Sequence, residues 1–159
     1  MLSATGVALP LLTLGFTRPP EAPSIRGVWR TVEVTMIGPN GRTITNVQPN
    51  QIVMTATHYN RVEIHAEGPR PILDDVAKAT ADDLRATWGP VVAEAGTYEV
   101  SGNVITMRPA VAKNPAAMVR GAYRTYTFRL AGDTVWIIPE RTEKGPVADA
   151  LKIKAVRVE

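Results

Sequence analysis

The chain has 159 residues, of which 45% are hydrophobic and 21% charged, and its formal net charge is +3. These values are typical of a single globular domain that can bury a core. Lysine and arginine are scattered among acidic residues without a basic run, so we expect no nucleic-acid partner. The lack of cysteine excludes disulfides, thiol catalysis and cysteine-ligated metals.

An uncharged apolar stretch at residues 4–16 is followed by a proline-rich segment at residues 18–23. The stretch has the length of a signal-peptide hydrophobic region and is too short to cross a bilayer comfortably, so we expect no membrane span. It lacks a preceding basic residue and an A-x-A cleavage site. It therefore predicts either a truncated signal on a periplasmic or secreted protein, or an apolar arm on a cytoplasmic one. Residues 1–24 form this arm and tether, and residues 25–159 form the domain.

Short β-rich segments separated by turn residues follow. In the first, at residues 27–34, Trp29, Thr31 and Glu33 share one face. The Gly-Pro-Asn-Gly sequence at residues 38–41 predicts a turn. Further strands are expected at residues 42–46, 51–57 and 60–66, before Gly-Pro-Arg-Pro at residues 68–71 ends the pattern.

Residues 80–88 form the one predicted helix. Thr80 is a suitable N-cap, and Asp82 and Asp83 fall in the first turn, where the helix dipole favours carboxylates. Gly89 and Pro90 end the helix.

The clearest hairpin in the chain spans residues 96–109, around Ser-Gly-Asn at its tip. A two-residue turn sorts its side chains into an apolar face and a polar face. The apolar face holds Tyr98, Val100, Ile105 and Met107, and the polar face holds Thr97, Glu99, Thr106 and Arg108. The sequence leaves open which face points inward. An apolar interior indicates a greasy pocket or a plain core, and a polar interior favours chemistry or anion recognition.

A loop is predicted at residues 111–119, a second hairpin at residues 123–130 and 134–139, and a last strand at residues 151–158. About eight short strands with one short helix predict an all-β protein. The alternation of apolar and polar residues favours an antiparallel up-and-down barrel. In a barrel of this size the interior is filled by side chains or holds one small ligand.

Several segments together resemble bacterial lipocalin-like domain proteins, over nearly everything after Ser24. The block from Trp88 to Pro115 is the most specific, whereas Gly-x-Trp alone is weak. The resemblance implies a calycin-type barrel, often secreted, with a cavity for a small apolar molecule, and it also implies that Arg157 stacks on Trp29. The matching segments are Gly27-Val28-Trp29-Arg30, His58-Tyr59, Arg70-Pro71, Ala81-Asp82-Asp83-Leu84, Trp88-Gly89-Pro90, Ala95-Gly96-Thr97-Tyr98-Glu99-Val100, Arg108-Pro109, Val111-Ala112-Lys113-Asn114-Pro115, Gly132-Asp133-Thr134 and Val156-Arg157-Val158-Glu159.

Candidate ligand-binding residues follow from this architecture. Arg108 either pairs with Glu99 outside the barrel or, if it points inward, binds a ligand carboxylate. Lys113 and Asn114 lie in a loop near the rim, where they either bind a ligand or serve loop geometry. The wall of a small barrel is both core and cavity, so the remaining candidates are Trp29, Tyr98, Met107, Tyr126 and Phe128.

The best catalytic candidates are His58 and Tyr59, as a base and a hydrogen-bond donor, together with Glu33 on the Trp29 face. The alternative is a structural pair at a strand end and a solvated carboxylate. His58 and His65 are seven residues apart, so a continuous strand places them on opposite faces, and we expect no metal site.

Three functions remain open. The first is binding of a small hydrophobic or amphipathic molecule in the barrel, without a cofactor. The second is a barrel enzyme of the isomerase, cyclase or hydratase type that uses His58, Tyr59 and Glu33. The third is an interaction or structural protein with a filled barrel. A homodimer is possible in each case.

Overall fold

The computed structural model describes residues 24–39, 41–148 and 151–159. The predicted arm and most of the tether, residues 1–23, lie outside this part. The elements in chain order are β1 (Gly27–Met36), β2 (Thr43–Ile44), β3 (Asn50–Met54), β4 (His58–Ile64), a 3₁₀ turn η1 (Val76–Lys78), α1 (Ala81–Trp88), β5 (Val91–Ser101), β6 (Val104–Ala112), a second 3₁₀ turn η2 (Pro115–Met118), β7 (Arg124–Ala131), β8 (Thr134–Thr142), β9 (Gly145–Pro146) and β10 (Leu151–Arg157).

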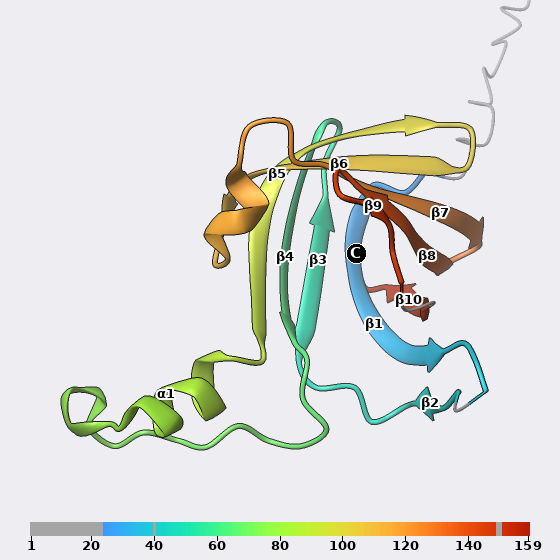
Figure 1. Ribbon diagram of the computed structural model, residues 1–159. Helices are drawn as coiled ribbons and strands as arrows, with labels where there is room; N and C mark the ends of the chain where they lie inside the picture. The colour runs from blue at the N-terminus through green and yellow to red at the C-terminus, as the bar shows by residue number, and fades with distance from the viewer. Residues whose placement is uncertain (1–23, 40, 149–150) are drawn as a thin grey trace, which may run out of the picture.

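The long strands form a closed antiparallel barrel, as predicted (Figure 1). Their order around the barrel is β1-β3-β4-β5-β6-β7-β8-β10, and β10 pairs with both β8 and β1 to close it. The short strands β2 and β9 pair antiparallel with the ends of β1 and β8. Within the described ranges, no helix has the length and apolar character needed to cross a membrane.

The central hairpin has the predicted register. Tyr98 pairs with Met107, and the turn contains two residues, with Gly102 at φ 58°. A positive φ at this position is readily adopted by glycine, which explains the residue at the tip. The apolar face points inward: Tyr98, Ile105 and Met107 are buried, whereas Val100 near the tip is 46% exposed.

Two predicted elements differ in extent from the structure. The strand expected at residues 42–46 is reduced to the two residues of β2. The loop expected at residues 111–119 begins as strand, because Val111 still pairs with Ala95 across the β5–β6 ladder. Only after Ala112 does the chain leave the sheet, and it then forms η2.

A β-bulge in β1 changes the face of Glu33. Thr31 pairs with Ala155 and Glu33 with Lys154, so Val32 has no counterpart on β10. Because Lys154 lies between two inward-facing residues of β10, Glu33 lies on the outer face of the barrel. Simple alternation from Trp29 predicts the opposite face.

The two ends of the barrel differ. Short hairpins join β3 to β4, β5 to β6 and β7 to β8 at one end, here called the hairpin end. The longer connections β1–β3, β4–β5, β6–β7 and β8–β10 lie at the other end, here called the loop end. The β4–β5 connection carries α1, which has a Thr80–Asp83 capping box and no buried residue. This excursion projects away from the barrel wall (Figure 1).

The hairpin end is held together by the first and last strands. The guanidinium of Arg157 lies 4.2 Å from the centroid of the Trp29 ring, the stacking that the lipocalin resemblance implies. The Trp29 Nε1 donates to the Ile25 carbonyl at 2.7 Å, and Arg157 Nη2 donates to the Ser24 carbonyl at 2.7 Å. These bonds seal this end of the barrel with the residues that precede β1.

Candidate functional site

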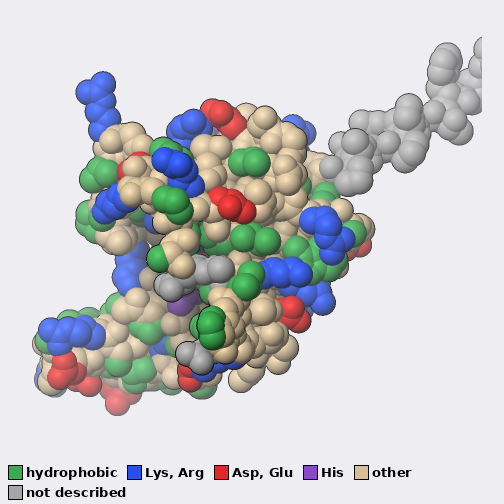
Figure 2. Space-filling view, turned by 45° about the vertical axis from the view of Figure 1, so that its right-hand side comes forward, with side chains coloured by type: hydrophobic (Ala, Val, Ile, Leu, Met, Phe, Trp, Pro, Cys, Tyr) green, Lys and Arg blue, Asp and Glu red, His purple; other side chains and the backbone are tan. Residues whose placement is uncertain are grey.

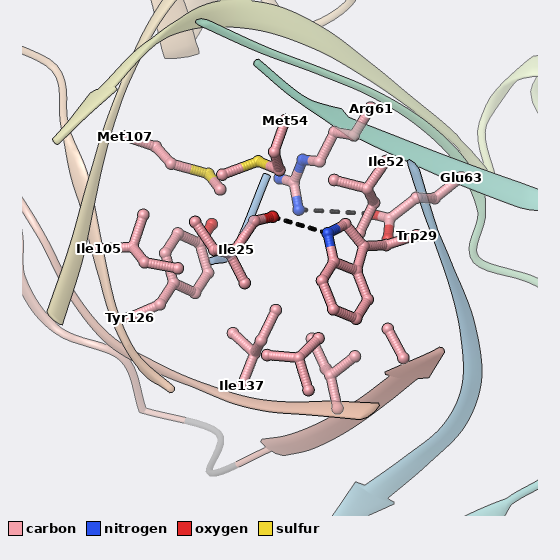
Figure 3. Close-up of a pocket in the computed structure, with 13 residues that line it drawn as sticks. Ile25, Trp29, Ile52, Met54, Arg61, Glu63, Ile105, Met107, Tyr126 and Ile137 are labelled. Atoms are coloured by element: carbon pink, nitrogen blue, oxygen red, sulfur yellow. Dashed lines mark hydrogen bonds and ion pairs between the residues drawn. The ribbon is translucent and has the colours of Figure 1, made fainter. Parts of the chain in front are cut away.

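The barrel encloses a cavity of about 40 Å³. Most of its wall is apolar, and the ends of Met54 and Met107 lie next to one another on one side of it (Figure 3). Two charged side chains, Arg61 and Glu63, also line it. The apolar lining residues are Ile25, Trp29, Ile52, Met54, Ile105, Met107, Val135, Ile137, Ile153 and Ala155.

Strand alternation places these charges inside. Tyr59, Arg61 and Glu63 are alternate residues of β4, so they share its inner face. Arg61 pairs in register with Glu94 of β5. Arg61 Nε donates to Glu94 Oε1 at 3.0 Å, and its Nη1 contacts Glu63 Oε2 at 3.3 Å.

Glu94 is the centre of the buried charges. Its side chain is 3% exposed. Its Oε1 also accepts from the Tyr59 hydroxyl at 3.2 Å, and its Oε2 accepts from Arg124 Nη1 at 2.6 Å. We call Arg61, Glu63, Glu94 and Arg124 the ionic cluster. Two guanidinium groups and two carboxylates balance its charge.

The surroundings of the cluster shift several pKa values. Burial raises the pKa of Tyr59 above its ordinary value of 10.0, and the nearby Glu94 carboxylate raises it further. Burial disfavours the charge of Arg61, but the oxygens of Tyr126, Glu63 and Glu94 outweigh it and raise its pKa. Tyr59 is therefore a neutral hydrogen-bond donor at physiological pH, and Arg61 is charged.

Glu63 is also charged at neutral pH. Burial raises its pKa, but the hydrogen bond with His65 and the charge of Arg61 together lower it below the ordinary value of 4.5. His65 Nε2 lies 3.4 Å from Glu63 Oε2, and the His65 side chain is 62% exposed. Glu63 thus connects the buried cluster with an imidazole accessible to solvent just beyond the end of β4.

Some hydrogen-bonding capacity in the interior is unused. Arg61 Nη2 and Glu63 Oε1 make no hydrogen bond to the residues that the structure describes. The Thr31 Oγ1, buried on the same side of the wall as Ala155, also has no partner among them. Arg61 and Glu63 line the cavity, so a water molecule or a ligand in it can bond to these free atoms, whereas Thr31 Oγ1 is fully enclosed.

The predicted aromatic wall is inside the barrel. Trp29, Met107 and Tyr126 line the cavity. Tyr98 is buried near the hairpin end, where its hydroxyl donates to the Thr55 carbonyl at 2.5 Å. Phe128 is partly buried and packs against the same core.

The polar ligand-binding candidates lie elsewhere. Arg108 pairs with Glu99 on the outer wall, with Nη1 3.1 Å from Oε1. Lys113 Nζ donates to the carbonyl oxygens of residues 88, 89 and 91, at 3.1 Å and 3.0 Å for the last two, and so binds the end of the α1 segment. Asn114 caps η2 through the Ala116 N–H at 3.1 Å. All three make local structural contacts outside the cavity.

The catalytic candidates are not brought together. His58 is exposed on the outer face, where Nδ1 lies 2.9 Å from Thr57 Oγ1. Glu33 is also on the outer face, whereas Tyr59 is inside and bonded to Glu94. The structure therefore pairs Tyr59 with a carboxylate that the sequence reasoning did not consider.

The ionic cluster is the feature that sequence reasoning missed. Its signal was present in the period-two spacing of Tyr59, Arg61 and Glu63, and in that of Glu94 with Tyr98. Inward positions of a small barrel are usually apolar, so charged residues at this spacing look like an outer face. Within the described ranges, no group of three or more histidine or acidic side chains is placed to hold a metal ion.

No protein-family model matches this chain, and a search of curated proteins finds no match. The closed barrel and the charges inside it are therefore the basis for the functional argument.

Proposed function

We propose that the protein binds a small amphipathic molecule in the cavity inside its barrel. The observation that carries this proposal is the pair Arg61 and Glu63, two charged side chains, 15% and 9% exposed, with unused hydrogen-bonding atoms on a mostly apolar wall. Buried ion pairs are poor stabilisers, and apolar residues of similar volume often serve a fold equally well. A role in recognition explains why charges are retained there.

The cluster favours an uncharged polar head group on the ligand. Arg61 offers an N–H and Glu63 an oxygen, so a hydroxyl or a primary amide can bond to both. A charged head group would upset the balance of the cluster in a buried environment, where an unpaired charge is costly. The ligand's apolar part then contacts the isoleucines and Trp29.

The size of the cavity restricts the ligand. A space of about 40 Å³ holds roughly three water molecules, or a ligand with only a few heavy atoms. Met54 and Met107 are flexible side chains that can change rotamer, so a somewhat longer ligand is admitted when they move aside.

Membership of the lipocalin-like group and export from the cytoplasm are part of the same proposal. The closed barrel and the Trp29–Arg157 stacking support the first. Fractionation of cells that express the full chain tests the second, and a strictly cytoplasmic protein would contradict it.

The proposal is tested by titrating the protein with linear alcohols of three to six carbons and following its thermal unfolding. Ligands that bind the folded state raise the melting temperature. Ile105→Ala enlarges the cavity and should strengthen binding of the longer alcohols. Val100→Ala is the matched control, because Val100 is the register partner of Ile105 but is largely exposed.

Solvent extraction and mass spectrometry of the purified protein search for a native ligand. The idea fails if extraction yields nothing and Ile105→Ala binds no alcohol.

A second candidate function is interaction through the β4–β5 excursion. Ile72 is 90% exposed, Val76 59% and Trp88 53%, and all three lie on this excursion. A contiguous apolar surface is typical of an interaction site. Figure 2 shows hydrophobic side chains among charged ones on this excursion, at the lower left of the view. Light scattering of the protein and of an Ile72→Ser variant tests self-association. If both are monomers, the excursion does not mediate self-association.

A further inference from the structure

A second pocket lies at the loop end of the barrel, between η2, the start of β7 and the end of β8. Its volume is about 180 Å³, and it shares no lining residue with the inner cavity. We call it the rim pocket. The lining residues that matter here are Asn114, Ala122, Tyr123, Arg124, Glu143 and Lys144.

Arg124 connects the rim pocket with the ionic cluster. Its Nη1 donates to Glu94, while Nε and Nη2 make no hydrogen bond to the residues that the structure describes. The Arg124 side chain is 29% exposed. One edge of the guanidinium is therefore bonded to a buried carboxylate, and the edge formed by Nε and Nη2 has two donors left. An edge of this kind matches the two oxygens of a carboxylate.

Glu94 holds this guanidinium in place. Because Glu94 is buried and also bonded to Arg61 and Tyr59, it has little freedom to move. A binding group whose position is fixed in advance loses less conformational entropy when a ligand arrives. The ionic cluster thus supports a preformed binding group at the rim.

The rest of the rim pocket suits an organic acid. Lys144 adds a second positive charge and has no ion pair with any described residue. The Tyr123 ring and the alanines of η2 and of residue 122 form an apolar wall. The one acidic lining residue, Glu143, accepts a hydrogen bond from the Tyr123 N–H at 3.4 Å.

We propose that the rim pocket binds a small organic carboxylate. The carboxylate oxygens accept hydrogen bonds from Nε and Nη2 of Arg124, and the apolar body of the ligand lies between Tyr123 and the alanines. This site is separate from the inner cavity, and it takes a charged ligand where the inner cavity takes an uncharged one.

The test compares benzoate with benzamide, which has nearly the same shape but no charge, by NMR titration of the full chain. We expect saturable shifts of the Ala116, Tyr123 and Lys144 amides with benzoate, and binding of benzamide weaker by about tenfold or more. Arg124→Lys keeps the charge but loses the two-donor edge, and should weaken benzoate binding by about tenfold. Ala122→Leu fills the pocket while every residue of the ionic cluster stays unchanged, and it should abolish binding. The exposed Ala110→Leu on β6 is its control and should bind normally.

Each result is decisive for the rim pocket. Equal binding of benzoate and benzamide, or benzoate binding that survives Ala122→Leu, would overturn the proposal. The absence of benzoate binding to the unmodified protein at millimolar concentration would also overturn it. The alcohol titrations of Ile105→Ala report on the inner cavity alone, so the two proposals succeed or fail independently.

Discussion

Replacing Glu94 with glutamine should destabilise the barrel strongly. The substitution keeps the size of the side chain but removes the negative charge that faces Arg61 and Arg124. One amide in a buried position then meets two guanidinium groups whose side chains are 15% and 29% exposed, and its NH₂ is a donor where Arg124 also donates. Breaking a buried pair by removing one partner costs about 3–5 kcal/mol, because the remaining charge is left uncompensated.

The magnitude can be checked against a surface pair on the same strand. Glu99 also belongs to β5 and also pairs with an arginine, Arg108, at 3.1 Å, but its side chain is 74% exposed. Glu99→Gln should therefore cost less than about 1 kcal/mol. Both variants are compared with the unmodified protein by urea unfolding, with circular dichroism as the readout, at neutral pH.

A small effect of Glu94→Gln would refute this reasoning. If it lowers the free energy of unfolding by no more than Glu99→Gln does, the cluster is hydrated and adaptable, and burial does not determine its energetics. A quadruple variant with Arg61→Met, Glu63→Leu, Glu94→Leu and Arg124→Met gives a further check. It should recover most of the lost stability, because apolar residues of similar size replace the whole cluster.

Three further predictions concern pH, backbone and dynamics. The pKa of folded Glu63 is below 4.5, so its contribution is present above that pH and lost as the pH falls further. The difference in unfolding free energy between the unmodified protein and Glu63→Gln should thus shrink below pH 4.5, and a constant difference would contradict the assigned shift. Gly27→Ala should cost about 3 kcal/mol in urea unfolding, since φ is +133° and a Cβ would contact Arg157 and lie 2.6 Å from the Glu159 carbonyl. Gly102→Ala, at φ +58° with open space around it, should cost about 1 kcal/mol. Equal costs for the two variants would show that the contacts of a Cβ at residue 27 do not affect stability. The α1 amides should exchange with solvent about 100-fold faster than those of Tyr98 and Ile105, because α1 buries no residue, and similar protection would mean that the excursion packs tightly.

The sequence predicts most of the fold because its local signals agree with one another. The glycine in each two-residue turn fixes the hairpin register, and Thr80 and Asp83 fix the start of α1. The bulge at Val32 could not be predicted in this way. It depends on how β1 meets β10, a pairing between distant parts of the chain, and it reverses the face on which Glu33 lies.

The candidate site was predicted only in its apolar half. Trp29, Met107 and Tyr126 line the cavity as expected of large apolar side chains in a small barrel. The charged half requires knowing that Arg61 lies opposite Glu94 and that Arg124 reaches the same carboxylate from β7. Each of these residues alone looks like an ordinary surface charge, and only the closed barrel brings their opposite charges together.

The pairing of β10 with β1 and β8 also determines when the protein can finish folding during synthesis. Arg157 bonds to the Arg26 carbonyl, 131 residues earlier in the chain. Until β10 leaves the ribosome, β1 and β8 each have one edge without its final partner. Unpaired edges can join other chains, and pairing between distant segments is slow. A nascent chain that stalls before β10 should therefore be prone to aggregation. Slower synthesis of the earlier strands should not bring the closure of the barrel forward.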